Sequence, residues 1–263
     1  MLIRLLEVTA LLLLAVASAT PVFSDEQGRA IFAERDQLDY GYVDQSVTME
    51  MTLKSPSGRE SHRRINLSKL EGEPGAGDKA LIVFEYPRDI EGTALLTHEA
   101  LGANDDSQWL YLPAYKRTKR IATGDRSGSF AGTEFSYEDL TGDKFEDFEY
   151  RYLGEDQLDG RLLLRIDRIP LTPNSQYSRQ ETWVDPANKQ VVLVFMYDVK
   201  GEHIKTFEAT DWVAYKDHYW RPHIMIMTHI QSGRSTLVKA SEYHLGVGLS
   251  EYDFDPNALR RIH

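Results

Sequence analysis

The segment from Phe84 to Leu140 reads FEYPRDIEGTALLTHEALGANDDSQWLYLPAYKRTKRIATGDRSGSFAGTEFSYEDL. It contains short extended stretches, the sequence Trp-Leu-Tyr-Leu-Pro at Trp109–Pro113, a basic run and a loop rich in glycine and aromatic residues. Nothing in it suggests a nucleophile paired with a general base. The segment therefore favours a protein that binds a ligand over one that catalyses a reaction.

Apolar and polar residues alternate along much of the chain with the period of a β-strand. In the clearest case, residues 47–54 read VTMEMTLK, so that every second side chain is apolar. Turn signals rich in glycine, proline and aspartate separate such segments, which is typical of an antiparallel meander. We expect strands at Val47–Lys54, Ser61–Leu67, Ala80–Tyr86, Thr93–Ala100, Gln108–Leu112, Arg117–Ala122, Phe148–Leu153, Leu162–Ile169, Gln180–Val184, Gln190–Tyr197, Ile204–Val213, Trp220–Ile230 and Ser235–Leu245.

Helical signals are few. They cover Gln27–Leu38, more weakly Thr133–Leu140, and a final turn that Asp255 enters with Pro256 at its first position. Turns are expected at Gly154-Glu155-Asp156 and again at Asp159-Gly160. The sequence therefore predicts a mainly β protein, with one large curved antiparallel sheet and two or three short helices.

Two of the expected strands, Val191–Tyr197 and Ile224–Met227, are apolar on both faces. A single sheet covered by a few helices buries such strands only if it curls or encloses something. The methionines after the first residue all lie in expected strands, where they either adapt to variable apolar ligands or simply fill gaps in the core. The residues that we expect to line an internal cavity are Met49, Met51, Leu53, Phe84, Trp109, Tyr111, Met196, Met225 and Met227.

The loop from Gly124 to Gly142 carries Phe130, Phe135 and Tyr137 on a backbone rich in glycine. It suits either a gate over an apolar cavity, a role that the Gln27–Leu38 helix would also suit, or a fixed plug at one end of the core.

A concentration of positive charge lies just before this loop. Arg117, Lys119 and Arg120 suit contacts with lipid headgroups or an acidic partner, or else protect an exposed edge strand from aggregation.

Several function classes are disfavoured. The net charge is -11, which makes nucleic acid a poor partner. The chain has no cysteine and no GxSxG motif, and His218, His223 and His229 lack the spacing of a metal site, so we expect neither metal nor cofactor. An envelope hydrolase that uses paired carboxylates stays open, because the separation of two carboxylates is not visible in a sequence.

The N-terminus has the pattern of a secretory signal peptide. Arg4 precedes the apolar run Val8–Ala17, which ends in small residues, so we expect residues 1–19 to be removed by cleavage after Ala19. The run is shorter than the roughly 20 apolar residues of a membrane-spanning helix. We expect residues 20–263 to form one soluble, exported domain.

Several motifs resemble the LolA-like outer-membrane lipoprotein-sorting proteins of the bacterial envelope. The similarity is longest over Phe84–Leu140, where Gly92-Thr93-Ala94, Trp109–Pro113, Arg120-Ile121 and Phe130–Leu140 match the pattern, and it continues through Glu181–Pro186, Thr236, Phe254 and Leu259.

The resemblance implies a strongly bent, unclosed β-barrel with a helical lid, acting as a periplasmic carrier that shields acyl chains of a lipoprotein or lipid on the way to the outer membrane without catalysis. Longer relatives are similar to proteins that accompany RND-type exporters, so a non-lipid-binding accessory subunit of such an exporter is a further alternative.

Overall fold

The computed structural model describes residues 25–73, 76–100, 106–142 and 144–261. The signal peptide expected over residues 1–19 lies outside these ranges. Within them, no helix is both long enough and apolar enough to cross a membrane.

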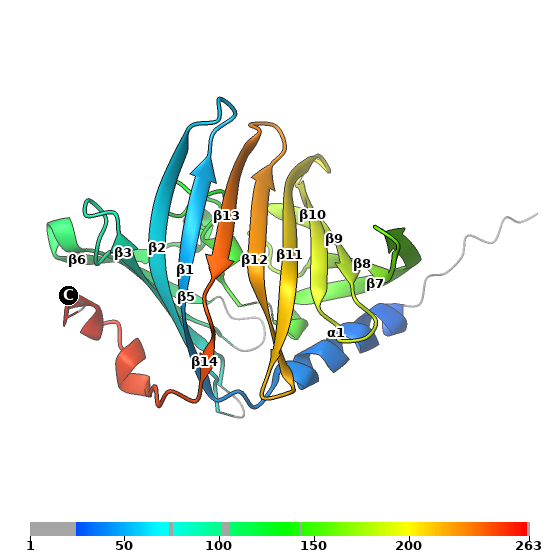
Figure 1. The fold of residues 1–263 in the computed structure, drawn as a ribbon, viewed down its shortest axis with the longest axis horizontal. Helices are drawn as coiled ribbons and strands as arrows, with labels where there is room; N and C mark the ends of the chain where they lie inside the picture. Colours follow the sequence, from blue (N-terminus) through cyan, green and yellow to red (C-terminus); the bar gives the residue numbers. More distant parts are fainter. Residues whose placement is uncertain (1–24, 74–75, 101–105, 143, 262–263) are drawn as a thin grey trace, which may run out of the picture.

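Fourteen strands of the described chain form one antiparallel sheet (Figure 1). Thirteen of them follow the order β6-β5-β4-β3-β2-β1-β13-β12-β11-β10-β9-β8-β7, and β14 pairs with β1. The strands are β1 (Asp44–Lys54), β2 (Glu60–Leu70), β3 (Lys79–Tyr86), β4 (Ala94–His98), β5 (Ser107–Leu112), β6 (Arg117–Ile121), β7 (Phe148–Leu158), β8 (Arg161–Pro170), β9 (Tyr177–Val184), β10 (Val191–Asp198), β11 (His203–Tyr215), β12 (Tyr219–His229), β13 (Arg234–Ala240) and β14 (His244–Leu245).

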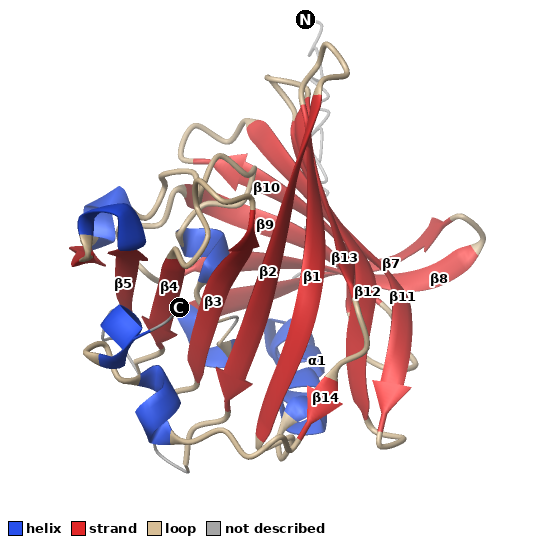
Figure 2. Cartoon of the chain, turned by 60° about the vertical axis from the view of Figure 1, so that its left-hand side comes forward, coloured by secondary structure: helices blue, strands red, loops and turns tan. Residues whose placement is uncertain are grey.

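The sheet consists of two runs of sequential hairpins that meet at the β1–β13 ladder. β1 to β6 form one run and β7 to β13 the other, so β6 and β7 lie at opposite ends of the strand order and the described sheet does not close. Figure 2 shows how strongly the strands twist and fan out. The expected class, a mainly β protein with one curved and unclosed sheet, is confirmed.

Each expected strand is present, with boundaries that differ by a few residues. Gly154-Glu155-Asp156 is not a turn, however, because β7 continues to Leu158 and the pairing with β8 shifts between Tyr152 and Gly154, as in a β-bulge. Near the end of the chain, the expected strand Ser235–Leu245 is divided into β13 and the two-residue β14.

The expected helix at Thr133–Leu140 is also wrong. Only Glu138–Leu140 form a 3-10 turn, η3. The backbone N–H of Glu134 instead donates to Oγ1 of Thr236 on β13, and the N–H of Phe130 donates to the carbonyl of Phe135. These bonds hold the segment in a loop against the sheet. The remaining 3-10 turns are η1 (Pro113–Tyr115), η2 (Thr123–Asp125), η4 (Phe145–Asp147), η5 (Glu251–Phe254) and η6 (Ala258–Arg261).

The helix α1 (Asp25–Asp39) forms where the sequence predicts one and packs on β7. Gly28 allows a close approach, since a β-carbon there would lie 3.1 Å from the backbone nitrogen of Tyr152. One turn further on, the buried ring of Phe32 stacks on Tyr150 with 4.8 Å between centroids. The small residue and the ring together fix α1 against this edge of the sheet.

The largest apolar cluster covers the sheet face that carries Val47, Phe84 and Met227, which we call the inner face. The connection from β6 to β7 runs across this face. Its residues 122–142, the crossing segment, place Phe130 5.3 Å from Phe84 on β3 and Phe135 6.4 Å from Phe207 on β11, measured between ring centroids. The crossing segment therefore supplies the apolar cover that the inner face needs.

The C-terminal segment covers part of the opposite, outer face. Phe254 and Leu259 are buried there against Ala94, Leu96 and Tyr111. The β3–β5 part of the sheet is thus covered on both sides.

The contact at Gly28 generates a stability prediction. Gly28→Val should lower the free energy of unfolding by about 1–3 kcal/mol, because the added methyl groups meet the β7 backbone. The matched control is Ala30→Val, which adds a β-branched residue on the exposed side of the same helix. Urea unfolding measures both, and equal losses in the two variants would show that α1 does not depend on this close approach.

Candidate ligand cavity

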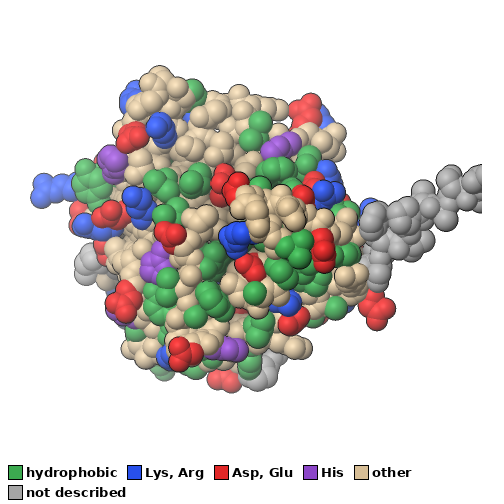
Figure 3. Space-filling view, turned by 45° about the vertical axis from the view of Figure 1, so that its right-hand side comes forward, with side chains coloured by type: hydrophobic (Ala, Val, Ile, Leu, Met, Phe, Trp, Pro, Cys, Tyr) green, Lys and Arg blue, Asp and Glu red, His purple; other side chains and the backbone are tan. Residues whose placement is uncertain are grey.

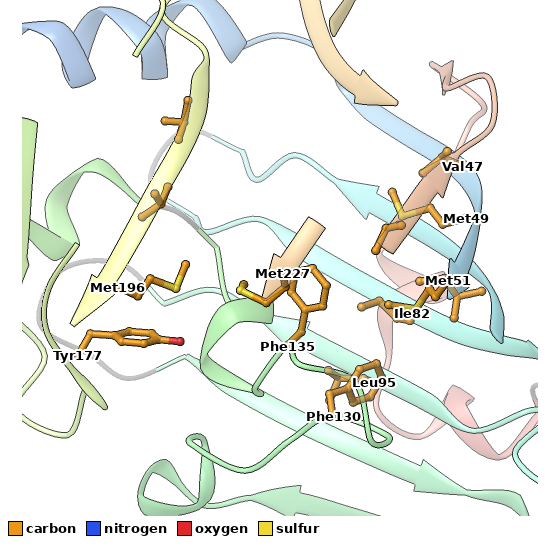
Figure 4. Close-up of a cluster of buried hydrophobic side chains, with 14 of the residues drawn as sticks. Val47, Met49, Met51, Ile82, Leu95, Phe130, Phe135, Tyr177, Met196 and Met227 are labelled. Carbon is orange, nitrogen blue, oxygen red and sulfur yellow. The ribbon is translucent and has the colours of Figure 1, made fainter. Parts of the chain in front are cut away.

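A cavity of about 880 Å³ lies between β9–β12 and the segments that connect β6 to β7 and β8 to β9. Its apolar wall is formed by Val194 and Met196 of β10, Phe207 and Ala209 of β11 and Met227 of β12, and Phe135 of the crossing segment closes one side. Figure 4 shows Phe135 against Met227 and, further along, Phe130 against Leu95.

Strand register explains why these side chains meet. Val194 pairs with Phe207, and Phe207 pairs with Met227, so the three side chains form one row across β10, β11 and β12 on the inner face. The small side chain of Ala209, two residues along β11, also lines the cavity. A row of large apolar groups beside a small one leaves a hollow in the sheet surface.

Charged groups stand at one side of the cavity. Nζ of Lys144 donates to Oδ1 of Asp106 at 2.8 Å and to the carbonyl of Ala100 at 2.8 Å, and lies 3.1 Å from Oδ2 of Asp147. Burial lowers the pKa of Lys144, but the hydrogen bond and the charge of Asp106 outweigh it and raise that pKa above its ordinary value. This lysine therefore stays charged at neutral pH.

Asp139 joins the crossing segment to two strands. Its carboxylate accepts hydrogen bonds from Nζ of Lys205 on β11 at 2.8 Å, from Oη of Tyr177 on β9 at 2.6 Å and from the backbone N–H of Ser136 at 2.8 Å. The side chains of Asp139 and Lys205 are only 5% and 8% exposed. Burial, together with the neighbouring Asp139, raises the pKa of Tyr177, so the tyrosine remains a donor.

Glu99 lies beside this region without lining the cavity. Its side chain fills the space that a β-carbon on Gly142 would need. Burial raises the pKa of Glu99 to about 7, helped by Asp78 and Asp106 and opposed by Lys69 and Lys144.

The structure separates the nine expected lining residues into three groups. Met196 and Met227 line the cavity. Trp109 and Tyr111 do not, because they point to the outer face and pack beside the C-terminal segment, whereas Leu110 between them faces inward. The other five belong to the inner core and do not line the cavity: Met49, Met51, Leu53, Phe84 and Met225. All of them except Met225 are buried, and the first three lie on β1.

The aromatic residues of the expected gate are packed into the protein. Phe130 is 2% exposed, and Tyr137 lies edge-on to it with 5.7 Å between ring centroids. The Tyr137 carbonyl accepts a hydrogen bond from Nε2 of the buried Gln108. Of the three, Phe135 alone is in the lining of the cavity. A gating motion of this segment stays a prediction.

The basic residues Arg117, Lys119 and Arg120 lie on β6, at an edge of the described sheet, and do not line the cavity. Lys119 is 3.9 Å from a carboxylate oxygen of Asp125, and Arg120 donates to Oγ of Ser107 at 3.0 Å. No three His, Asp or Glu side chains of the described residues gather in a way that could hold a metal ion.

Sequence reasoning missed the charged residues Asp106, Asp139, Lys144 and Lys205. Asp139 and Lys205 are 66 positions apart, and Asp106 and Lys144 are 38 apart. In the sequence each looks like an ordinary surface charge, because the pairs meet only through the path of the connection from β6 to β7.

Proteins of known structure share this fold. A protein-family model described as "Uncharacterized protein" matches residues 76–261. A solved domain from Vibrio parahaemolyticus, named for outer membrane lipoprotein sorting, is 41% identical over 90% of this chain and 100% of its own, with a TM-score of 0.87. This chain belongs to the LolA-like family of outer-membrane lipoprotein-sorting proteins.

Two further solved structures are similar to this chain. A DUF1329 family protein from Desulfovibrio piger is 27% identical over 89% of this chain and 98% of its own, with a TM-score of 0.85. A LolA superfamily protein from Nitrosomonas europaea is 16% identical over 87% of this chain and 97% of its own, with a TM-score of 0.69, which shows a shared fold. No curated protein matches the sequence.

The buried ion pair of Asp139 and Lys205 can be tested by a double-mutant cycle. Asp139→Asn and Lys205→Met should each cost about 3–5 kcal/mol of unfolding free energy, because each leaves a buried charge without its partner. The double variant should lose clearly less than the sum of the two. Strictly additive losses in urea unfolding would contradict a direct coupling.

The raised pKa of Glu99 predicts that the stability of the protein depends on pH. Below about pH 4.5 its carboxyl is protonated in both states; as the pH rises to 7, the unfolded state ionises first and the native state loses stability. Glu99→Gln should therefore stabilise the protein by about 3 kcal/mol at pH 8 and leave it unchanged at pH 4. Urea unfolding at both pH values measures this, with exposed Glu242→Gln as control. A pH-independent gain would contradict it.

Proposed function

We propose that this protein is a periplasmic carrier that shields acyl chains of a lipoprotein or lipid in its cavity and moves them toward the outer membrane without catalysis. Residues 20–263 would act as one exported domain after loss of residues 1–19, and the inner membrane would supply the cargo. The observation that carries the proposal is the apolar row of Val194, Phe207 and Met227 inside a cavity of about 880 Å³.

The size and chemistry of the cavity suit an acyl chain. Its volume falls within the roughly 300–1,000 Å³ typical of small-molecule pockets. Met196 and Met227 present flexible thioether side chains, which adapt to chains of different length. Each methylene that leaves water contributes about 0.8 kcal/mol, so a dozen would supply about 10 kcal/mol. A bilayer offers nearly the same gain, which lets the cargo exchange with a membrane at low net cost.

The mouth of the cavity suits the polar end of such a ligand. Its rim includes the exposed residues Glu146, Leu171 and Asn174, and the lining also contains the buried Asp106 and the partly buried Lys144. A headgroup or an acylated N-terminal residue left at this rim would keep its polar atoms hydrated or hydrogen-bonded while the chain lies inward.

A carboxylate hydrolase is the second candidate, and the raised pKa of Glu99 is the observation in its favour. Glu99 is not among the residues that line the cavity, and the part of the wall formed by β10, β11 and β12 is apolar. The carrier accounts for more of the site. The third reading, an accessory subunit of an RND-type exporter, would bind protein and leave the cavity without lipid.

The decisive measurement is mass spectrometry of a solvent extract from mature protein purified without detergent, followed by titration with a fluorescent fatty acid. We expect copurified lipid or acylated peptide in stoichiometric amount. Lipid-free protein that also takes up no fatty acid would eliminate the carrier. If Glu99→Gln retains an intact substrate that the parent protein cleaves, the hydrolase would be favoured.

A variant pair tests whether this cavity is the binding site. Ala209→Leu adds three carbons to the cavity wall and should weaken fatty-acid binding at least tenfold. Thr210→Leu, on the exposed opposite side of the same strand, is the matched control and should bind as the parent does. Equal affinities of all three proteins would place the ligand elsewhere.

A further inference from the structure

A second surface forms where the C-terminal segment meets β6. The 3-10 turn η6 packs against β6, and in Figure 1 both lie at the same side of the molecule. The contact places two C-terminal arginines beside the basic run that precedes the crossing segment. Together they form a surface that we call the cationic edge, in which all side chains are exposed: Lys116, Arg117, Lys119, Arg120, Arg260 and Arg261.

Among the described residues, the aspartates of the C-terminal segment have other partners, since Asp253 accepts from Ser250 and Asp255 from Asn257. Asp125 lies 3.9 Å from Lys119, and Asp89 and Glu91 flank the turn whose Gly92 abuts Pro113, next to the start of β6. Glu251 of the C-terminal segment is already paired with a lysine of β3. The β7 side of the molecule differs, since Figure 3 shows Lys and Arg interspersed there with Asp and Glu. The chain as a whole has a net charge of -11, so these six exposed cations oppose its overall sign.

An exposed aromatic side chain lies next to the cationic edge in the sequence. Tyr115 ends the 3-10 turn η1 immediately before Lys116 and is 72% exposed. Tyrosine beside lysine and arginine is the combination found at membrane–water interfaces, where the ring sits at the level of the headgroups.

Protection of an edge strand explains only part of these features. Charged side chains on β6 do discourage pairing with another strand. Arg260 and Arg261, however, lie on a different element that has no strand edge to protect, and an exposed tyrosine gives no such protection. The whole set shares one property, which is attraction to an anionic, partly apolar surface.

We propose that the cationic edge docks this protein on a bilayer surface that contains anionic phospholipid. Each Lys or Arg near such a surface strengthens binding about fivefold, and the field fades within a Debye length of about 8 Å at physiological salt. The negative charge elsewhere on the molecule is therefore screened, and it also orients the protein with β6 toward the membrane. The inference deepens the proposed carrier function, which supplies the reason for visiting a membrane.

The test is cosedimentation of the mature protein with two kinds of vesicle, one of phosphatidylcholine alone and one of phosphatidylcholine with phosphatidylglycerol. We expect binding to the second kind, weakening steeply as salt rises. Equal binding to both kinds, or binding to neither, would overturn the proposal and leave the surface to an acidic protein partner.

Charge-reversal variants locate the contact. Arg260→Glu with Arg261→Glu should reduce binding to the anionic vesicles at least twentyfold, and Tyr115→Ser should reduce it severalfold with little change in salt dependence. The matched control, Arg59→Glu with Lys200→Glu, changes the net charge equally at exposed hairpins far from β6. An equal loss in the control would mean that net charge alone acts, which would overturn the proposal.

The same variants separate this proposal from the carrier function. Arg260→Glu with Arg261→Glu leaves every residue of the cavity wall in place and should take up fluorescent fatty acid as the parent does. Vesicle binding by lipid-free protein that takes up no fatty acid would eliminate the carrier alone. Fatty-acid uptake without vesicle binding would eliminate the docking surface alone.

Discussion

The packing of Phe130 against Phe84 is the contact on which the arrangement of this protein depends. An unclosed sheet with an apolar inner face must cover that face with something, and here the cover is the connection between its two edge strands. Because the crossing segment packs tightly on β3 but meets β9–β12 mainly through Phe135 and Asp139, the inner face is filled at one end and hollow at the other. The path of the crossing segment over the inner face therefore determines both the position of the core and the position of the cavity.

The strands were predictable because alternation and turn residues are local properties. Which face of a strand points inward is not local. Residues 108–112 alternate cleanly, yet their two aromatic side chains, Trp109 and Tyr111, face the C-terminal segment while Leu110 faces the core. Periodicity shows which side chains share a face, and only the partner that covers that face decides its role. Met196 and Met227 do line the cavity, but their role in binding a ligand stays a prediction.

In the crossing segment, the long-range contacts could not be predicted from the sequence. Its glycines and aromatics marked it as a special loop, and its likeness to known sorting proteins gave the fold, but neither showed that Asp139 would bond to Lys205 and Tyr177. Such pairs depend on a crossing of the whole sheet, which no short window of sequence contains. The same holds for Arg260 and Arg261, whose closeness to β6 follows from the route of the C-terminal segment.

The β1–β13 ladder also constrains the order in which the molecule can be built. Met49 pairs with Ala240, so the edge of β1 is without this partner until the last part of the chain has been made. Closure of such a long loop is slow compared with the hairpins on either side. Until β13 is made, the edge of β1 is open to pairing with another chain. A chain with this topology benefits from being held unfolded until it is complete, as chains threaded through a membrane are.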